Sequence, residues 1–178
     1  MLYFFSMDIL SHGLWGGIAF GRKSKQNFII AFLFGILPDF LSFGPLFISQ
    51  IFVPSLRVRP DYTSGHPDLT LLPHYVTQIY DYTHSLVIFL LVFLIVWAIR
   101  RKPYFLMLAW PLHVLYDIPF HTNAFFPTPF LWPISNITID GIAWGNPRVF
   151  IPNWILLIVL YIVWWLFKKR KETTILPK

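Results

Sequence analysis

Residues 82–99, with the sequence YTHSLVIFLLVFLIVWAI, decide the fold class. The stretch contains no charged residue, and Arg100, Arg101 and Lys102 follow it at once. A helix needs about 20 apolar residues to cross the hydrocarbon core of a bilayer, and a slightly shorter run suffices when its flanks contribute. Backbone groups in lipid must be satisfied within the segment itself, so we predict a membrane helix here.

Further apolar segments of similar character lie on both sides of this one. They occupy residues 104–121, 152–167, 26–52 and 1–21. The sequence therefore predicts an all-α fold, a polytopic helical bundle with about five transmembrane helices. We interpret residues 1–178 as a single integral membrane domain. Pro38 and Pro45 interrupt the segment 26–52, so we expect that helix to be kinked or broken.

The composition of the chain favours the same class. Hydrophobic residues make up 56% and charged residues 12%, whereas a typical soluble domain is about 25% charged. The formal net charge of +6 comes from short basic clusters beside apolar segments. Such clusters usually orient membrane proteins, and we do not expect nucleic acid as a partner. The chain has no cysteine, so any metal must be held by imidazole and carboxylate groups.

The basic clusters also predict an orientation. They lie at residues 22–25, 100–102 and 168–171, after the first, third and fifth segments, and so on one side of the membrane. The positive-inside rule makes that side cytoplasmic. We therefore expect the amino terminus outside, the carboxyl terminus in the cytoplasm, and the long connections 53–81 and 122–151 outside.

Ionisable residues inside these segments fall at one depth. Such groups are costly in a membrane helix and are functional candidates by default. At about 1.5 Å per residue from the cytoplasmic end of each segment, His12 and His113 lie about 15 Å deep. On the same count Asp8, Asp39, His84 and Asp117 lie about 20–22 Å deep. Four helices thus contribute to one layer in the outer half of the membrane.

The spacing within the segments indicates the chemistry of this layer. Residues four apart share a helix face, which pairs Asp8 with His12 and His113 with Asp117. Imidazole and carboxylate groups are suitable ligands for zinc or another divalent first-row metal. The sequence therefore predicts a metal site built from several transmembrane helices near the outer face of the bilayer.

The candidate ligands also have structural interpretations. Asp39 follows Pro38 and could cap the second half of a broken helix. His84 could be an interfacial histidine at the end of its helix. Asp8 could orient His12 from behind without binding the metal.

Other ionisable residues near the layer are weaker candidates. Asp81 precedes His84 by three positions and could begin the helix or orient a ligand. His121 lies one turn beyond Asp117, and we expect it at the interface and not among the ligands. His66 and His74 belong to the connection 53–81, where solvated loop residues are the norm.

Several stretches around these residues resemble the motifs of a known family, the inner-membrane metal-dependent hydrolases of bacteria and archaea, some of them described as LexA-regulated. The ligand pattern is also similar to that of the zinc-dependent phospholipase C and P1 nuclease group. The stretches are SHGLWGG around His12, Leu37-Pro38-Asp39, Thr83-His84-Ser85, His113-Val-Leu-Tyr-Asp117 and Leu131-Trp132-Pro133.

The resemblance implies a location and a site. It implies the cytoplasmic (inner) membrane of a bacterium or archaeon, zinc as the metal, and a catalytic part for Asp39 and His84. The chain departs from the family at Leu41, where many relatives are acidic, and at residues 79–81, where they have His-Arg-Gly. The metal ligands that the resemblance implies are His12, Asp39, His84, His113 and Asp117.

We therefore expect a membrane hydrolase in which a metal-activated water attacks an ester or phosphoester. The depth of the layer favours a lipid or lipid-linked substrate. One alternative is a metal-ion or proton transporter, but the inner halves of the segments are almost wholly apolar and offer no polar path. Another is a structural membrane protein whose metal ties helices together, which would need a coordination shell closed by the protein.

Overall fold

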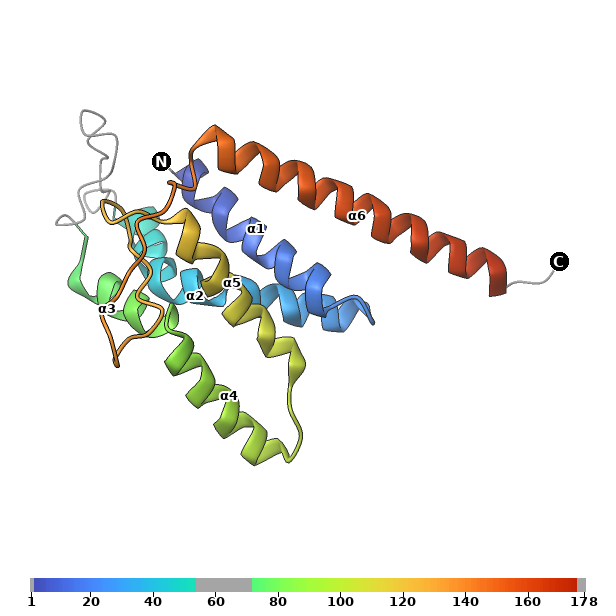
Figure 1. Cartoon of the computed structure of the whole chain (residues 1–178), viewed down its shortest axis with the longest axis horizontal. Coiled ribbons are helices and arrows are strands. Elements are labelled where there is room, and N and C mark those ends of the chain that lie inside the picture. The colour runs from blue at the N-terminus through green and yellow to red at the C-terminus, as the bar shows by residue number, and fades with distance from the viewer. Residues whose placement is uncertain (1, 54–71, 176–178) are drawn as a thin grey trace.

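The computed structural model describes residues 2–53 and 72–175, and these residues form helices joined by irregular connections (Figure 1). No β-strand occurs in this part of the chain, so the predicted all-α class is confirmed. The elements are α1 (Leu2–Phe20), α2 (Lys25–Phe52), α3 (His74–Thr83), α4 (Leu86–Arg100), the 3₁₀ helix η3 (Phe105–Leu108), α5 (Ala109–Phe120) and α6 (Pro147–Ile175).

Two helices are long and apolar enough to cross a membrane, α2 and the part of α6 from Pro147 to Arg170. Helices α3 and α4 form a third candidate if they are taken as one span with a bend of 62°. The segments predicted at 1–21 and 104–121 contain shorter apolar helices, Ile9–Phe20 and Phe105–Phe120. The described residues therefore support two to three spanning helices, and the five predicted spans are not confirmed.

Segment 26–52, predicted to be kinked or broken, is not broken. Helix α2 runs without interruption through Pro38 and Pro45. The break falls instead between α3 and α4, where the Ser85 hydroxyl accepts hydrogen bonds from the backbone N–H groups of Val87 and Ile88. A serine that satisfies the first free N–H groups favours the start of a new helix, so α4 begins at Leu86 and not at residue 82.

Close packing of α1 on α2 brings the first candidate ligand into the bundle. A Cβ atom added to Gly35 would lie 2.5 Å from the backbone oxygen of His12, and one added to Gly16 would lie 2.7 Å from that of Ala31. Glycine at these positions lets the two backbones approach, as small residues do at helix contacts in membranes. His12 is therefore held directly beside the middle of α2.

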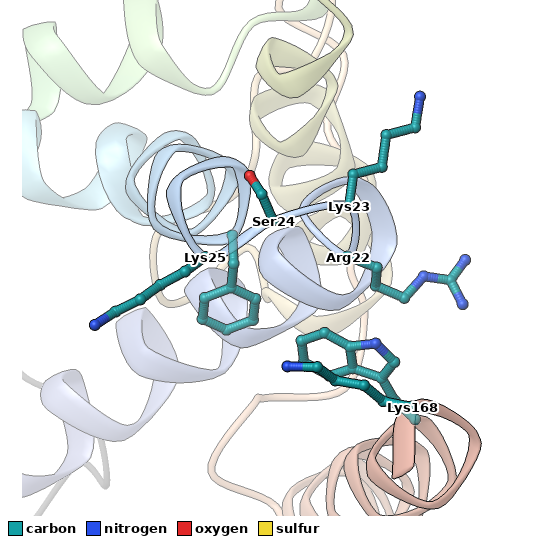
Figure 2. Close-up of a pocket in the computed structure, with 7 residues that line it drawn as sticks. Arg22, Lys23, Ser24, Lys25 and Lys168 are labelled. Atoms are coloured by element: carbon teal, nitrogen blue, oxygen red, sulfur yellow. The ribbon is translucent and has the colours of Figure 1, made fainter. Parts of the chain in front are cut away.

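The basic clusters that follow the first and last predicted segments lie at one end of the molecule. Arg22, Lys23 and Lys25 from the α1–α2 connection and Lys168 from α6 line a single cavity of about 330 Å³ (Figure 2). Phe28 of α2 and Trp164 of α6 also line it, and their rings stack with centroids 5.8 Å apart. The cavity contains none of the predicted metal ligands, which lie elsewhere in the bundle.

Candidate metal centre

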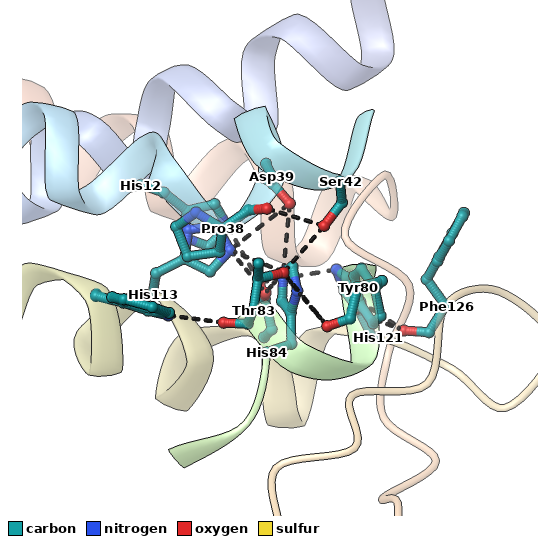
Figure 3. Close-up of polar contacts among 12 residues, drawn as sticks. His12, Pro38, Asp39, Ser42, Tyr80, Thr83, His84, His113, His121 and Phe126 are labelled. Atoms are coloured by element: carbon teal, nitrogen blue, oxygen red, sulfur yellow. Dashed lines mark hydrogen bonds and ion pairs between the residues drawn. The ribbon is translucent and has the colours of Figure 1, made fainter. Parts of the chain in front are cut away.

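The structure brings the five predicted ligands together from four helices (Figure 3). His12 comes from α1, Asp39 from α2, and both His113 and Asp117 from α5, while His84 is the residue that ends α3. All five are buried, with relative exposures of 0–2% for His12, His84, His113 and Asp117 and 6% for Asp39. Such a concentration of buried ionisable groups requires charge compensation within the cluster.

Four of these side chains present ligand atoms around one point. The Nε2 atom of His84 lies 3.2 Å from that of His113, and 3.4 Å from both Asp39 Oδ1 and Asp117 Oδ2. The Nε2 atom of His113 lies 3.7 Å and 3.0 Å from the same two oxygens. Ligands bound at about 2.0–2.1 Å in a tetrahedral zinc site are separated by about 3.3 Å. The separations observed here therefore suit a small divalent cation.

His12 approaches the other oxygen of the same carboxylate. Its Nε2 atom lies 3.0 Å from Asp117 Oδ1, and its ring stacks on that of His113 with centroids 3.8 Å apart. Two overlapping groups result, His12 with His113 and Asp117, and Asp39 with His84 and His113, each with ligand atoms within 4.8 Å of one another. Either group could hold a metal ion.

The backbone fixes which nitrogen of each imidazole faces this point. His113 Nδ1 lies 2.6 Å from the carbonyl oxygen of Gly35, and His84 Nδ1 lies 3.2 Å from that of Tyr80. A carbonyl oxygen can only accept a hydrogen bond, so a neutral ring whose Nδ1 donates to it presents an unprotonated Nε2 to the cluster. Metal-binding histidines are characteristically oriented from behind in this way.

The positions of these nitrogen and oxygen atoms can be compared with what a divalent cation requires. In the tautomer that donates from Nδ1, the two Nε2 atoms 3.2 Å apart direct their lone pairs into the same small space, beside two carboxylates. Lone pairs at this distance repel, and two buried negative charges are costly unless they are compensated. A divalent cation bound to neutral imidazoles would balance both carboxylates and separate the lone pairs. The donor set therefore fits such a cation.

Two hydroxyl groups, of Thr83 and of Ser42, support His84 from behind, and Ser42 is not among the candidates predicted from the sequence. Thr83 Oγ1 lies 3.0 Å from His84 Nδ1 and 2.9 Å from Ser42 Oγ. The indole N–H of Trp110 donates to the backbone oxygen of Thr83 at 2.6 Å. A sequence signal existed for Ser42, which follows Asp39 by three positions and therefore shares its helix face.

His121 lies nearer the cluster than predicted. Its Nε2 atom is 3.7 Å from Asp117 Oδ1, and its side chain is 12% exposed. Its Nδ1 atom is 2.7 Å from the backbone oxygen of Phe126 and 2.8 Å from the Tyr80 hydroxyl. The spacing of residues 113, 117 and 121 by four places all three on one face of α5, which is the signal that pointed to this position.

The remaining candidates are not brought to the cluster. Asp81 is half-buried on α3 and has no hydrogen bond or ion pair with the cluster in the described part of the chain. His74 is exposed at the start of α3. The side chain of Asp8 and the whole of His66 lie outside the described residues.

The cluster has the chemistry of a divalent-cation site, with two carboxylates, three closely packed imidazoles and orienting contacts behind two of the rings. The metal that it would select is not fixed by these residue types, since imidazole and carboxylate bind several first-row metals. Comparisons with protein-family models, curated proteins and solved structures found no match to this chain.

Proposed function

We propose that this protein is a membrane-embedded, metal-dependent hydrolase of an ester or phosphoester, and that the five clustered residues hold its metal, zinc in the first instance. The observation that carries the proposal is the pair of Nε2 atoms, 3.2 Å apart, that lie beside two carboxylates while each Nδ1 faces a backbone carbonyl. Two buried carboxylates need positive charge to balance them, and a divalent cation bound to neutral imidazoles would supply it. The motif resemblance to inner-membrane metal-dependent hydrolases points in the same direction.

The clustered residues differ in how accessible they are, and this difference assigns their parts in catalysis. A divalent metal, when bound, acidifies a water molecule toward a pKa of about 7 and stabilises negative charge on an ester oxygen. The side chain of Asp39 is 8% exposed, against 0% for His84 and 2% for Asp117, so Asp39 lies on the more accessible side of the cluster. We assign the catalytic part to Asp39 and to His84, whose ring Tyr80 and Thr83 hold in place.

We propose a lipid or lipid-linked substrate. The cluster lies among apolar helices, and the residues that follow Asp39 on α2, Phe40 and Leu41, are exposed. A polar group that approaches Asp39 therefore passes next to apolar surface, as the headgroup of a membrane lipid would. The five-span arrangement, with the amino terminus outside and the carboxyl terminus in the cytoplasm of a bacterium or archaeon, belongs to the same proposal.

Elemental analysis of the protein purified in detergent tests the metal assignment. We expect bound zinc in the wild type and its loss in His113→Ala and Asp39→Ala. The matched control is His74→Ala, which removes an exposed imidazole at the start of α3 and should retain the metal. Circular dichroism verifies that each variant keeps its helices. Unchanged metal content in both ligand variants would refute the assignment.

A screen of phosphoesters and lipid esters then tests the reaction. Released phosphate or fatty acid is measured for the metal-loaded wild type, for the chelated protein and for Asp39→Ala. We expect turnover only in the first of these. Turnover that survives in the chelated protein would contradict a metal-dependent mechanism.

A second candidate is a structural metal site that ties the helices together. The burial of His12, His84, His113 and Asp117 at 0–2% exposure favours it, since a structural site is closed by protein ligands whereas a catalytic one keeps a position for water. Tightly bound metal without turnover on any substrate, and without exchange with added small anions, would select this candidate over the hydrolase.

A further inference from the structure

The connection between α5 and α6, residues 122–146, has an unusual composition for an irregular segment. Asp140 is its only charged residue. We call this segment the isoleucine loop, because Ile134, Ile137, Ile139 and Ile142 are exposed by 79%, 58%, 48% and 53%. Connections that run through water are usually polar, and a contiguous exposed apolar patch marks a surface that contacts something apolar.

Hydrogen bonds hold the isoleucine loop in one conformation. The Asn123 backbone N–H donates to Asp140 Oδ1 at 2.8 Å, and Thr138 Oγ1 donates to Asn123 Oδ1 at 3.0 Å. Thr138 and Asp140 thus turn toward Asn123, while their neighbours Ile137 and Ile139 are exposed by 58% and 48%. The polar side chains are the ones that the loop uses for its internal contacts, and the isoleucines are left on its surface.

The same loop is fastened beside the start of an apolar helix. The Leu86 N–H donates to the backbone oxygen of Phe130 at 3.0 Å, and the Ser85 hydroxyl donates to that of Trp132. The Trp132 ring packs edge-on against that of Tyr82, with centroids 4.3 Å apart. Figure 1 shows the loop running along α3 to the junction with α4. Ile134, two residues beyond Trp132, therefore lies near the first turn of α4.

The position of the isoleucine loop beside the start of α4 suggests membrane lipid as the material that covers the isoleucines. Helix α4 continues from the junction with exposed Leu90, Leu91 and Leu94, an apolar face suited to lipid. A tryptophan–tyrosine pair is typical of the boundary between lipid and water. The isoleucine loop thus extends an apolar helix surface at the level where that helix enters the bilayer. Because the loop has a single charged residue, it offers a protein partner few ion pairs.

We propose that the isoleucine loop inserts its isoleucine side chains into the phospholipid bilayer at the end of the molecule where α4 begins. The proposal rests on the membrane location of the chain and is independent of the metal and of hydrolysis. It also has a consequence for the cluster. The Gly141 N–H donates to the backbone oxygen of His121 at 2.8 Å, so insertion would place His121, beside the cluster, close to the lipid headgroups.

The absence of cysteine allows a direct test. Single cysteines replace Ile134, Ile137, Ile139 or Ile142, carry an environment-sensitive fluorophore, and are placed in vesicles of phosphatidylcholine and phosphatidylglycerol. Aqueous iodide and a nitroxide-bearing phospholipid serve as the two quenchers. Leu91→Cys is the control for a lipid-facing position, and Asn146→Cys, exposed at the end of the same loop, is the control for water.

We expect the four isoleucine positions to behave like Leu91→Cys, with several-fold stronger quenching by the nitroxide lipid and several-fold weaker quenching by iodide than at Asn146→Cys. Iodide quenching equal to that at Asn146→Cys, with Leu91→Cys still protected, would overturn the loop insertion alone. Iodide access at Leu91→Cys as well would overturn the membrane location. Pyrene excimers between labelled copies would show that a second copy covers the loop, which also overturns the proposal.

Discussion

The Nε2 atoms of His84 and His113 lie 3.2 Å apart, although each ring directs its Nδ1 to a backbone carbonyl, that of Tyr80 for His84 and that of Gly35 for His113. A proton on Nδ1 leaves a lone pair on Nε2, so the two rings repel unless positive charge lies between or beside them. His84 at the end of α3 and His113 in the middle of α5 are thereby held at one shared site. We therefore expect the stability of the helix bundle to depend on a bound cation.

Removal of the metal should lower the thermal stability of the protein. A ligand present at 100 times its dissociation constant stabilises the folded state by about 2.7 kcal/mol, and this contribution disappears on chelation. Thermal unfolding in detergent, followed by circular dichroism before and after treatment with a zinc chelator, measures the effect, and added zinc should restore it. An unchanged melting curve, once elemental analysis has verified that the metal is gone, would argue against the linkage.

Thr83→Val should weaken metal binding without removing a ligand. The substitution keeps the shape of the side chain but removes the hydroxyl that lies 3.0 Å from His84 Nδ1. Loss of a contact that orients a metal-binding histidine typically lowers metal affinity by about 10–100-fold. Competition with a fluorescent zinc chelator measures the affinity.

The control is Thr77→Val on the same helix, where the hydroxyl donates to the backbone oxygen of His74 at an exposed position. It should leave the affinity unchanged. Equal affinities in the two valine variants would show that Thr83 does not support the centre.

Gly35→Ala should destabilise the contact between α1 and α2. The new methyl group would lie 2.5 Å from the backbone oxygen of His12, and overpacking of this kind costs about 1–3 kcal/mol. Metal affinity should fall as well, because His12 must move. At Gly44 the nearest atoms are 3.4 Å away in the Phe40 ring, so Gly44→Ala should be neutral or slightly stabilising. Thermal unfolding compares Gly35→Ala with Gly44→Ala. Equal losses of stability in the two variants would contradict the close approach of α1 and α2 at Gly35.

Asn153→Ala should loosen α6 while the metal stays bound. Asn153 Oδ1 accepts hydrogen bonds from the Trp15 indole N–H at 2.8 Å and from the Tyr116 hydroxyl at 2.6 Å. Asn153 itself is buried, and its loss removes an acceptor that two half-buried donors share, at a cost of about 1–3 kcal/mol. Thermal unfolding measures the loss of stability, and elemental analysis measures the metal content. Gln26→Ala, at an exposed position, is the control. Loss of metal in Asn153→Ala would mean that α6 supports the centre after all.

That the candidate ligands come together was predictable from the sequence because the rise of a helix is nearly constant. His12, Asp39, His113 and Asp117 lie in helices whose residues could be counted from a basic cluster, and the structure brings them together. Counting along each helix needed no knowledge of how the helices pack. The common direction of the side chains did, since it depends on the Gly35 contact and on the rotation of each helix.

The local course of the backbone was less predictable. Composition alone favours one helix over residues 82–99, but the Ser85 hydroxyl competes for the N–H groups that would continue α3, and His84 is left at the bend. In α2 the two prolines predict a kink or a break, and the helix is continuous through both of them. His121 contacts Tyr80 and Phe126 and lies beside Asp117, a packing that the sequence did not specify.

The contribution of ligands from both α1 and α5 has a consequence for how the protein is made. Synthesis proceeds from the amino terminus, so His12, Asp39 and His84 are made well before His113 and Asp117. The ligand set is complete only after α5 has docked against α1 and α2. On the proposed function, metal loading would therefore be a late step of biogenesis, after these three helices have assembled.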